Sequence, residues 1–566
     1  MKIDSTTAAI IEEIYGCVPD VLADGIAKLE NQRDADPASA ALWSERDIVL
    51  ITYADQVRAD GVAPLQALLD FLLDRSLDEV IRCVHLLPFC PYTSDDGFSV
   101  VDYLAVDPAS GTWADIANLG DSFDLMFDLV LNHVSQKHEW FQRFLQGDPE
   151  FADFFIDQDP SADLSQVVRP RSLPLLTEFD SADGIKQVWT TFSADQVDLN
   201  YANPRVMLVM LETLVEYARR GGRIIRLDAI AFLWKEVGTN CIHRPQTHAA
   251  VRLMRRVLDR VAPGTLVLTE TNVPHAENIR YFGRGDDQAH MVYQFSLPPL
   301  LLDAIHSGET SVLRDWLKTL KPPSDCTTFF NFTASHDGIG VRPLEGIVPA
   351  QRVDRLAKIV RAQGGRVNTR RNSDGSDSPY ELNITYLNAV ADASVVSAAE
   401  HARRFLATQA IMLSIQGIPA VYFHSLVGTP NDQAGVEESG QNRRINRHKY
   451  QQSELQAALS KPHSLQRRVF DGYRRLLEVR IEQPAFHPGA AQEVIELPGD
   501  GLIGFVRTAR SGQRLAVLAN LSCQPKTVDG AMVDLNLRYD ELAQQRLWKN
   551  DPIGMRPFQV RWLTAQ

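Results

Sequence analysis

Eight short apolar runs, separated by amphipathic stretches, are the feature that most constrains the fold of this 566-residue chain. The runs lie at residues 48–52, 80–87, 125–131, 223–227, 266–269, 292–295, 328–332 and 420–423. Stretches with helical spacing lie between them, for example at residues 64–73, 204–219, 248–261 and 399–413. Apolar strands that alternate with helices favour a parallel sheet covered by helices. Eight such units predict an α/β fold, a (β/α)8 TIM barrel.

The rest of the sequence predicts additions to this barrel, which itself spans residues 47–489. Residues 1–46 have helical spacing and predict an N-terminal helical extension. Two connections, at about 140–190 and 338–400, are longer than a barrel requires and predict inserted subdomains over its C-terminal face. From 490 to 566, short alternating strands predict a small C-terminal antiparallel β domain.

Composition restricts the partners and the compartment. The net charge of −15 argues against a nucleic-acid or anionic membrane surface. The six cysteines are scattered without CxxC spacing, which is typical of reduced thiols in a cytoplasm. The first residues show no signal-peptide pattern, and no apolar segment reaches membrane-spanning length. We therefore expect a cytoplasmic protein with no nucleic-acid or membrane partner.

The segment 222–230 places an arginine and an aspartate at the end of one apolar run. Alternation along a strand puts Arg226 and Asp228 on the same face. In a barrel, that face looks into the cavity, and the guanidinium is expected to hold the carboxylate ionised at neutral pH, as a nucleophile requires. Taken alone, a structural ion pair explains this motif better.

Polar residues at the ends of the other runs favour a catalytic role over a structural ion pair. The run at 125–131 is followed by Asn132 and His133, the run at 266–269 by Glu270, and the seventh leads to Asp337. Active sites of such barrels lie at this face. Two carboxyl groups about 5 Å apart suit retaining glycoside chemistry, in which one attacks the anomeric carbon and the other protonates the leaving oxygen. A third binds the sugar hydroxyls more tightly as the oxocarbenium ion develops.

The segments 128–133, 222–228, 268–270 and 334–337 resemble, in order, the four signature regions of the α-amylase family, glycoside hydrolase family 13. Residues 196–200 resemble a fifth region. Within that family, residues 51–55, 85–89, 95–98, 169–171, 417–422 and 445–448 resemble the sucrose phosphorylase subfamily. The resemblance covers most of the chain from Val49 to about Tyr450.

The resemblance implies roles for individual residues. Asp228 is expected to be the nucleophile, Glu270 the general acid/base and Asp337 the stabiliser of the transition state. Further residues are expected to hold the glucosyl unit, to orient the nucleophile or to bind phosphate: Asp95, His133, His336 and Arg443 for the glucosyl unit, Arg226 for orientation and Arg171 for phosphate.

Three substrate-side positions depart from sucrose phosphorylases. Phe232 replaces a tyrosine, Asn272 replaces a histidine, and a Tyr-Gln pair becomes Tyr380-Glu381. Residues 238–243, 270–275, 289–295 and 378–381 resemble the glucosylglycerate phosphorylase branch instead. The resemblance implies reversible phosphorolysis of 2-O-α-D-glucosyl-D-glycerate to α-D-glucose 1-phosphate and D-glycerate.

Glycerate and phosphate are both anions, so the acceptor side of the site should supply cations. Arg171, His275 and Arg370 are the candidates. The alternatives are that His275 caps a helix and that Arg370 is a solvated loop charge. The insertions would keep water from the glucosyl-enzyme ester. We expect no metal, because no calcium-loop spacing is present, and no cofactor; the resemblance also raises a homodimer as a candidate assembly.

Other functions remain open at this stage. The chain could be a sucrose, glucosylglycerol or sucrose 6-phosphate phosphorylase of the same subfamily, or a hydrolase. A catalytically inactive, sugar-binding barrel is a different class of protein. The joint presence of Asp228 and Glu270 weighs against that last alternative.

Overall fold

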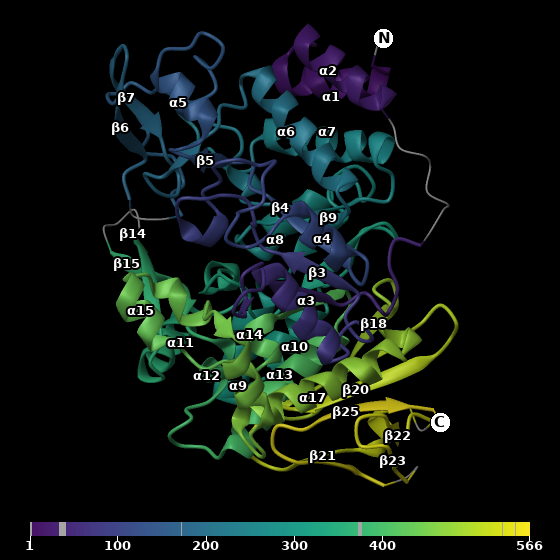
Figure 1. Cartoon of the computed structure of the whole chain (residues 1–566). Coiled ribbons are helices and arrows are strands. Elements are labelled where there is room, and N and C mark those ends of the chain that lie inside the picture. Colours follow the sequence, from purple (N-terminus) through teal and green to yellow (C-terminus); the bar gives the residue numbers. More distant parts are fainter. Residues whose placement is uncertain are drawn as a thin grey trace.

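The computed structural model describes residues 3–32, 41–170, 173–371, 376–534, 536–548 and 551–565. Eight strands close into a barrel in the order β1-β16-β12-β11-β10-β9-β4-β3, and each adjacent pair is parallel. They are β1 (Val49–Thr52), β3 (Cys83–Leu86), β4 (Asp124–Leu129), β9 (Gly222–Leu227), β10 (Leu266–Thr269), β11 (Met291–Tyr293), β12 (Thr328–Asn331) and β16 (Ile418–Tyr422). Each predicted apolar run supplies one strand, which confirms the α/β barrel (Figure 1).

Helices that cover the barrel begin at a side-chain cap or at a proline in the first turn. They include α3 (Pro64–Asp74), α4 (Trp113–Gly120), α6 (Pro204–Arg219), α7 (Pro245–Val261), α9 (Leu297–Ser307), α13 (Ala398–Ser414) and α17 (Leu465–Ile481). At the start of α6, the side chain of Asn203 accepts a hydrogen bond from the amide of Arg205, and Pro204 occupies the first turn. The apolar face of α6, which includes Met207 and Leu211, is buried.

Two N-terminal helices, α1 (Ser5–Tyr15) and α2 (Asp20–Asn31), pack on α7 and α6, at the top of Figure 1. The side chain of Asp4 caps α1 and pairs with Arg256 of α7 at 2.8 Å. Gly16, with φ of 73°, ends α1 in the left-handed region. Residues 1–2 and 33–40 of the predicted extension lie outside the described residues.

The first predicted insertion contains α5 (Glu139–Leu145) and an antiparallel hairpin of β6 (Leu176–Ser181) and β7 (Gly184–Trp189). Its core is aromatic: the ring of Phe141 lies 4.9 Å from the rings of both Phe155 and Phe179. The phenylalanines of this insertion therefore extend the main hydrophobic core, although the segment has little periodicity.

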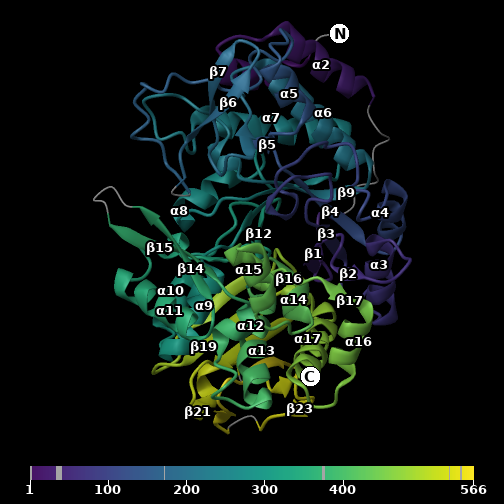
Figure 2. The same ribbon diagram turned by 60° about the vertical axis from the view of Figure 1, so that its left-hand side comes forward.

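The second insertion folds as a three-stranded antiparallel sheet, in the order β13-β15-β14, with a helix packed on it. Its elements are β13 (Ile339–Gly340), α11 (Ala350–Ala362), β14 (Arg366–Arg371) and β15 (Asp377–Asn383). Figures 1 and 2 place β14 and β15 on the same side of the molecule as β6 and β7. Both insertions therefore lie over one face of the barrel.

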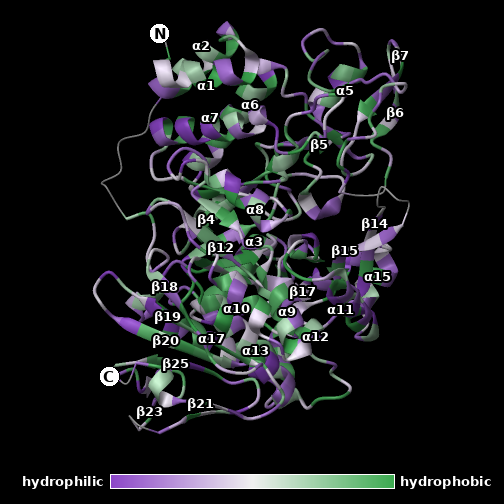
Figure 3. Cartoon of the chain, turned by 180° about the vertical axis from the view of Figure 1, so that it is seen from behind, coloured by the Kyte–Doolittle hydropathy of each residue, from purple (hydrophilic) through white to green (hydrophobic). Residues whose placement is uncertain are grey.

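The C-terminal part forms the predicted antiparallel β structure. A six-stranded sheet runs in the order β18-β19-β20-β25-β22-β23, with strands β18 (Ala491–Ile495), β19 (Leu502–Thr508), β20 (Arg514–Asn520), β22 (Tyr539–Asp540), β23 (Gln545–Arg546) and β25 (Val560–Thr564). Alternate residues of β20 face two cores: Leu515 and Val517 join the core of the barrel and its helices, whereas Ala516 and Leu518 belong to a separate apolar cluster. Figure 3 shows β20 as a largely hydrophobic strand, and α13 packs against it.

Within the described part of the chain, no helix combines the length and the apolar composition that crossing a membrane would require.

Candidate active site

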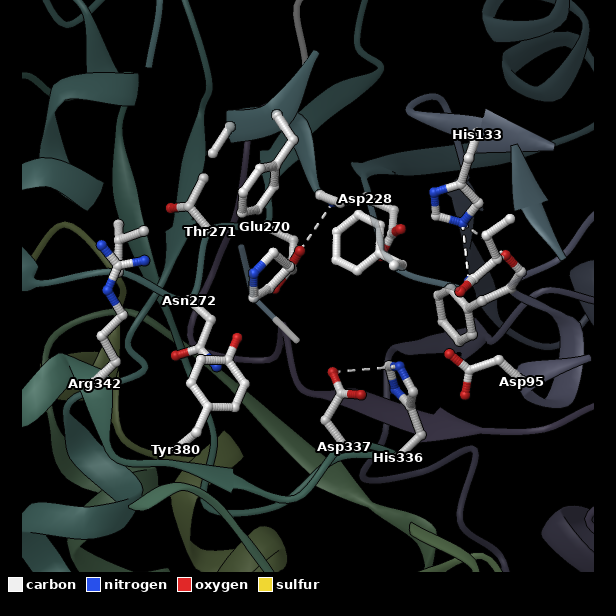
Figure 4. Close-up of a pocket in the computed structure, with 18 of the residues that line it drawn as sticks. Asp95, His133, Asp228, Glu270, Thr271, Asn272, His336, Asp337, Arg342 and Tyr380 are labelled. Atoms are coloured by element: carbon white, nitrogen blue, oxygen red, sulfur yellow. Dashed lines mark hydrogen bonds and ion pairs between the residues drawn. The ribbon is translucent and has the colours of Figure 1, made fainter. Parts of the chain in front are cut away.

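A pocket lies at the carboxyl ends of the barrel strands and collects most of the predicted residues. Asp228 directly follows β9, Glu270 directly follows β10, and Asp337 follows β12. The predicted residues that line the pocket are Asp95, His133, Asp228, Phe232, Glu270, Asn272, His336, Asp337, Tyr380 and Arg443. Figure 4 labels eight of them around one space: Asp95, His133, Asp228, Glu270, Asn272, His336, Asp337 and Tyr380.

Arg226 links the carboxylates at the floor of the pocket. Its Nη1 donates to Oδ1 of Asp228 at 2.7 Å and also to Asp128, while its Nη2 lies 4.0 Å from Oε2 of Glu270. Asp128 is buried and lies 2.6 Å from Nε2 of His85. Although burial opposes ionisation, Arg226 and His85 lower the pKa of Asp128 to about 2. Arg226 therefore shares its charge with a permanently ionised partner.

The ionisation of Asp228 differs from the expectation. Burial, together with repulsion from Glu270, raises the pKa of Asp228 to about 8, despite the opposing effect of Arg226. Burial likewise raises the pKa of Glu270. The sequence-based prediction that Arg226 alone keeps Asp228 ionised at neutral pH does not hold, because burial outweighs the effect of the guanidinium. The two carboxyl groups instead share a proton.

The turn after Asp228 brings these two carboxyl groups together. Ala229 adopts a left-handed conformation, with φ of 49° and ψ of 28°. In this conformation its amide donates a 2.9 Å hydrogen bond to Oε2 of Glu270. A residue other than glycine with positive φ is uncommon and points to a local constraint at a functional site.

Arg443 organises the opposite wall of the pocket. Its Nη1 lies 2.6 Å from Oδ1 of Asp337 and 3.9 Å from Oδ2 of Asp95, while its Nη2 lies 2.8 Å from Glu381. Glu381 also accepts a hydrogen bond from the amide of Gly338 at 3.2 Å. Glu381 is buried and does not belong to the pocket lining, so among the described residues it contacts Arg443 rather than the pocket.

The two pocket histidines are neutral, and both contact Phe98. Burial lowers the pKa of both His133 and His336. Nε2 of His133 lies 2.8 Å from the carbonyl oxygen of Phe98, and the ring of His336 stacks on that of Phe98 at 4.6 Å. In Figure 4 the side chain of His336 also lies beside Asp337, with 3.5 Å between Nε2 and Oδ2.

A buried ion pair that sequence reasoning missed supports His133 from behind. Nζ of Lys235 lies 2.7 Å from Asp198 and donates to Oδ1 of Asn132 at 2.6 Å. Asn132 in turn lies 3.3 Å from Nδ1 of His133. The apolar neighbours of Lys235 in the sequence gave no sign of this long-range contact.

The structure places the predicted anion-binding cations elsewhere or does not describe them. Arg171 lies outside the described residues. His275 begins α8 (His275–Asn278), does not line the pocket, and has its ring near those of Trp316 and Phe329. Arg370 pairs with Glu345 at 2.6 Å and also does not line the pocket.

Arg342, which was not predicted, lines the pocket beside Asn272 and Tyr380. It follows Asp337 closely in the sequence and precedes Pro343. Its position could have marked it as a site residue, because it is a cation shortly after the strand end that carries Asp337.

Comparisons with known proteins agree with this arrangement. Residues 78–337 match the family model described as alpha amylase, catalytic domain. A glucosylglycerate phosphorylase from Allomeiothermus silvanus is 48% identical, covering 92% of this chain and 91% of that protein. One from Spirochaeta thermophila is 51% identical, covering 86% of this chain and 83% of that protein. The crystal structure of sucrose 6F-phosphate phosphorylase from Thermoanaerobacter thermosaccharolyticum is 26% identical, with a TM-score of 0.74, covering 86% of this chain and 96% of that one.

The barrel and the carboxyl pair at its C-terminal face define a glycoside-processing enzyme of the TIM-barrel class. The chain belongs to the α-amylase family, glycoside hydrolase family 13, and within it to the group that contains the glucosylglycerate phosphorylases.

Proposed function

We propose that the protein is a retaining phosphorylase that transfers a glucosyl unit from 2-O-α-D-glucosyl-D-glycerate to phosphate, giving α-D-glucose 1-phosphate and D-glycerate. The reaction is reversible. The observation that carries the proposal is the similarity to glucosylglycerate phosphorylases along nearly the whole chain. The carboxyl pair after β9 and β10 supplies the chemistry.

In the first step, an oxygen of Asp228 attacks the anomeric carbon. The bond between that carbon and the glycerate oxygen breaks, and Glu270 gives its proton to the leaving oxygen. Arg226 assigns these roles, because it lies 2.7 Å from Asp228 and 4.0 Å from Glu270. The closer guanidinium favours the ionised form of Asp228, which leaves the shared proton on Glu270.

In the second step, an oxygen of phosphate attacks the anomeric carbon of the glucosyl ester. Its proton passes to Glu270, the bond to Asp228 breaks, and the inverted configuration is inverted again, so the α configuration is retained overall. Asp337, held by Arg443 at 2.6 Å, supports the sugar hydroxyls as positive charge develops. Asp95, His133, His336 and Arg443 contact the glucosyl unit in this proposal.

The proposal also assigns the acceptor side and the cover of the pocket. Phe232, Asn272 and Tyr380 line the pocket and are assigned to the leaving group and phosphate. Pro170 of the first insertion and Tyr380 of the second both reach the lining. The two insertions thus keep bulk water from the glucosyl ester while phosphate enters. Arg171 stays a proposed phosphate ligand.

Two further assignments complete the proposal. The negative charge and the scattered cysteines support a cytoplasmic location, where phosphate and the glucoside would meet the enzyme. A homodimer is the proposed assembly.

Acceptor choice in the synthetic direction tests the proposal. The enzyme is given α-D-glucose 1-phosphate with D-glycerate, fructose, glycerol or fructose 6-phosphate, and phosphate release is followed. We expect D-glycerate to give the highest kcat/KM. A preference for fructose, glycerol or fructose 6-phosphate would assign a sucrose, glucosylglycerol or sucrose 6-phosphate phosphorylase instead. Release that needs no acceptor but water would make the protein a hydrolase, and no release from any mixture would favour an inactive sugar-binding barrel.

A further inference from the structure

Arg342 lines the pocket, and no carboxylate among the described residues forms an ion pair with it. Its Nε is buried, and within the described residues it has no hydrogen-bond partner. Its guanidinium forms no ion pair with any carboxylate in the described part of the chain, whereas Arg443 contacts Asp337 and Glu381. An unpaired, partly buried guanidinium is costly to maintain and favours binding of an anion.

The backbone around Arg342 fixes where this charge lies. The amide of Val341 donates to the carbonyl oxygen of Tyr380 at 3.1 Å, which ties the segment to the second insertion. On the other side of the arginine, the hydroxyl of Ser296 donates to the carbonyl oxygen of Pro343 at 3.2 Å. Arg342 itself begins the short 3-10 helix η4 (Arg342–Leu344). The arginine therefore projects from a segment that is held on both sides.

Asn272 lies next to this segment with a second unused polar atom. Its Oδ1 is buried and has no hydrogen-bond partner among the described residues. A Cβ atom on Gly340 would lie 2.6 Å from both Nδ2 and Oδ1 of Asn272, so the asparagine side chain packs directly on this glycine. Gly340 and Arg342 thus bring the amide and the guanidinium to one wall of the pocket.

This wall lies across the pocket from the proposed glucosyl side. Figure 4 shows Arg342, Asn272 and Tyr380 on one side of Glu270, and Asp95 and His133 on the other. A leaving group that Glu270 protonates must lie beside Glu270 and away from the glucosyl unit. The free charge and the unused carbonyl oxygen are therefore placed for the leaving group.

We propose that Arg342 binds the carboxylate of a 2-hydroxy acid leaving group and that Asn272 accepts a hydrogen bond from its remaining hydroxyl. This inference rests on the proposed phosphorylase function and assigns its selectivity for an acidic acceptor. A guanidinium can bind a carboxylate through two parallel hydrogen bonds, which an ammonium group cannot reproduce.

The test compares a charged acceptor with an uncharged one in the variant Arg342→Gln. With α-D-glucose 1-phosphate as donor, kcat/KM is measured for D-glycerate and for glycerol, which lacks the carboxylate. We expect kcat/KM for D-glycerate to fall roughly 10- to 100-fold, the usual loss for a hydrogen bond to a charged group. The kcat/KM for glycerol should stay within about 3-fold of the wild-type value, because glycerol has no carboxylate for Arg342 to bind.

Two further variants make the result specific. Arg361→Gln removes the same charge from the exposed face of α11 in the same insertion, and we expect no change in acceptor preference. Arg342→Lys keeps the charge but loses the paired geometry, so an intermediate loss for D-glycerate is expected. It also serves as the test variant if Arg342→Gln does not fold, as judged by its melting temperature.

Three results would overturn the inference. An equal loss for D-glycerate and glycerol would mean that Arg342 supports the pocket generally. Unchanged kcat/KM for D-glycerate would mean that it does not contact the carboxylate. The exchange of labelled phosphate into α-D-glucose 1-phosphate needs no glycerate. If the variant loses as much of this exchange as of its kcat/KM for D-glycerate, Arg342 is assigned to phosphate. If the wild type itself does not prefer D-glycerate, the proposed function fails, whatever the variants do.

Discussion

The backbone amide of Ala229 donates a 2.9 Å hydrogen bond to Oε2 of Glu270. The residue after the proposed nucleophile thus holds the proposed acid/base in place, and the positive φ of Ala229 makes the bond possible. Two neighbouring strands, β9 and β10, are coupled at the point where their catalytic groups emerge. The carboxyl pair is therefore a single unit, and changes to one member should alter the behaviour of the other.

The first prediction concerns the nucleophile. Asp228→Asn keeps the shape of the side chain and its hydrogen bond from Arg226, but it cannot form the glucosyl ester. We expect phosphorolysis to fall by roughly 10⁴-fold or more, because the covalent step is lost. Steady-state release of α-D-glucose 1-phosphate is the measurement. Asp286→Asn, at an exposed position, is the matched control and should retain full activity; activity near the wild-type level in Asp228→Asn would remove Asp228 from the mechanism.

The same substitution should change stability in a pH-dependent way. Burial raises the pKa of both Asp228 and Glu270 above their values in the unfolded chain, to about 8 for Asp228, so the folded carboxyl pair binds one extra proton between about pH 4 and pH 8. The wild type therefore loses stability as pH rises from about 4 to about 8, whereas Asp228→Asn does not. We expect the variant to melt a few degrees above the wild type at pH 8, with a smaller difference at pH 5. A constant difference across this range would contradict the raised pKa.

A third prediction separates the acid from the nucleophile. Glu270→Gln cannot protonate a leaving oxygen, so phosphorolysis of the glucosylglycerate should fall roughly 10³-fold. α-D-Glucosyl fluoride needs no proton to release fluoride, and glucosyl transfer from it to the enzyme should be reduced far less. Fluoride release in the first turnover is the measurement. Equal losses with both donors would place Glu270 in binding instead of acid catalysis.

The barrel could be predicted because its strands are buried on both faces and read as continuous apolar runs. For the same reason, Asp228 and Glu270 stood out as polar residues at strand ends. The aromatic core around Phe141 could not be predicted in its hairpin form, because the segment has neither helical nor strand periodicity. Its fold depends on contacts between residues that lie far apart in the sequence.

Charge placement was the less predictable part of the site. Arg226 was correctly placed beside Asp228, but its second partner, Asp128, comes from another strand, and burial changes the expected ionisation. His275 looked like an anion ligand, yet its ring lies near Trp316. Such outcomes depend on which side chains the closed barrel brings together, and spacing along one segment does not encode them.

The buried pair of Lys235 and Asp198 leads to a fourth prediction. The side chains are 3% and 0% exposed, and Nζ lies 2.7 Å from the carboxylate. Lys235→Met leaves Asp198 buried without its counter-charge, which we expect to cost about 3–5 kcal/mol. The melting temperature should fall by several degrees. Adding Asp198→Asn removes the stranded charge and should restore part of the loss; failure to restore any would show that the charge of Asp198 is not the cause.

A fifth prediction follows from the position of Glu381 behind Arg443. Glu381→Gln restores the Tyr-Gln pair of sucrose phosphorylases, so a direct role in acceptor choice would shift the preference toward fructose. The structure leads to a different expectation, because Glu381 lies outside the pocket lining and its carboxylate meets Arg443 at 2.8 Å. Without that charge, Arg443 is held by Asp337 and Asp95, and contact with the glucosyl unit weakens. We expect KM for α-D-glucose 1-phosphate to rise roughly 3- to 10-fold, the usual cost of one hydrogen bond, while the ratio of kcat/KM for D-glycerate to that for fructose stays constant.

Glu438→Gln, at an exposed position of α15 (Gln433–Ser439), is the control for loss of a carboxylate. A shift toward fructose in Glu381→Gln, with KM for the donor unchanged, would place Glu381 on the acceptor side after all.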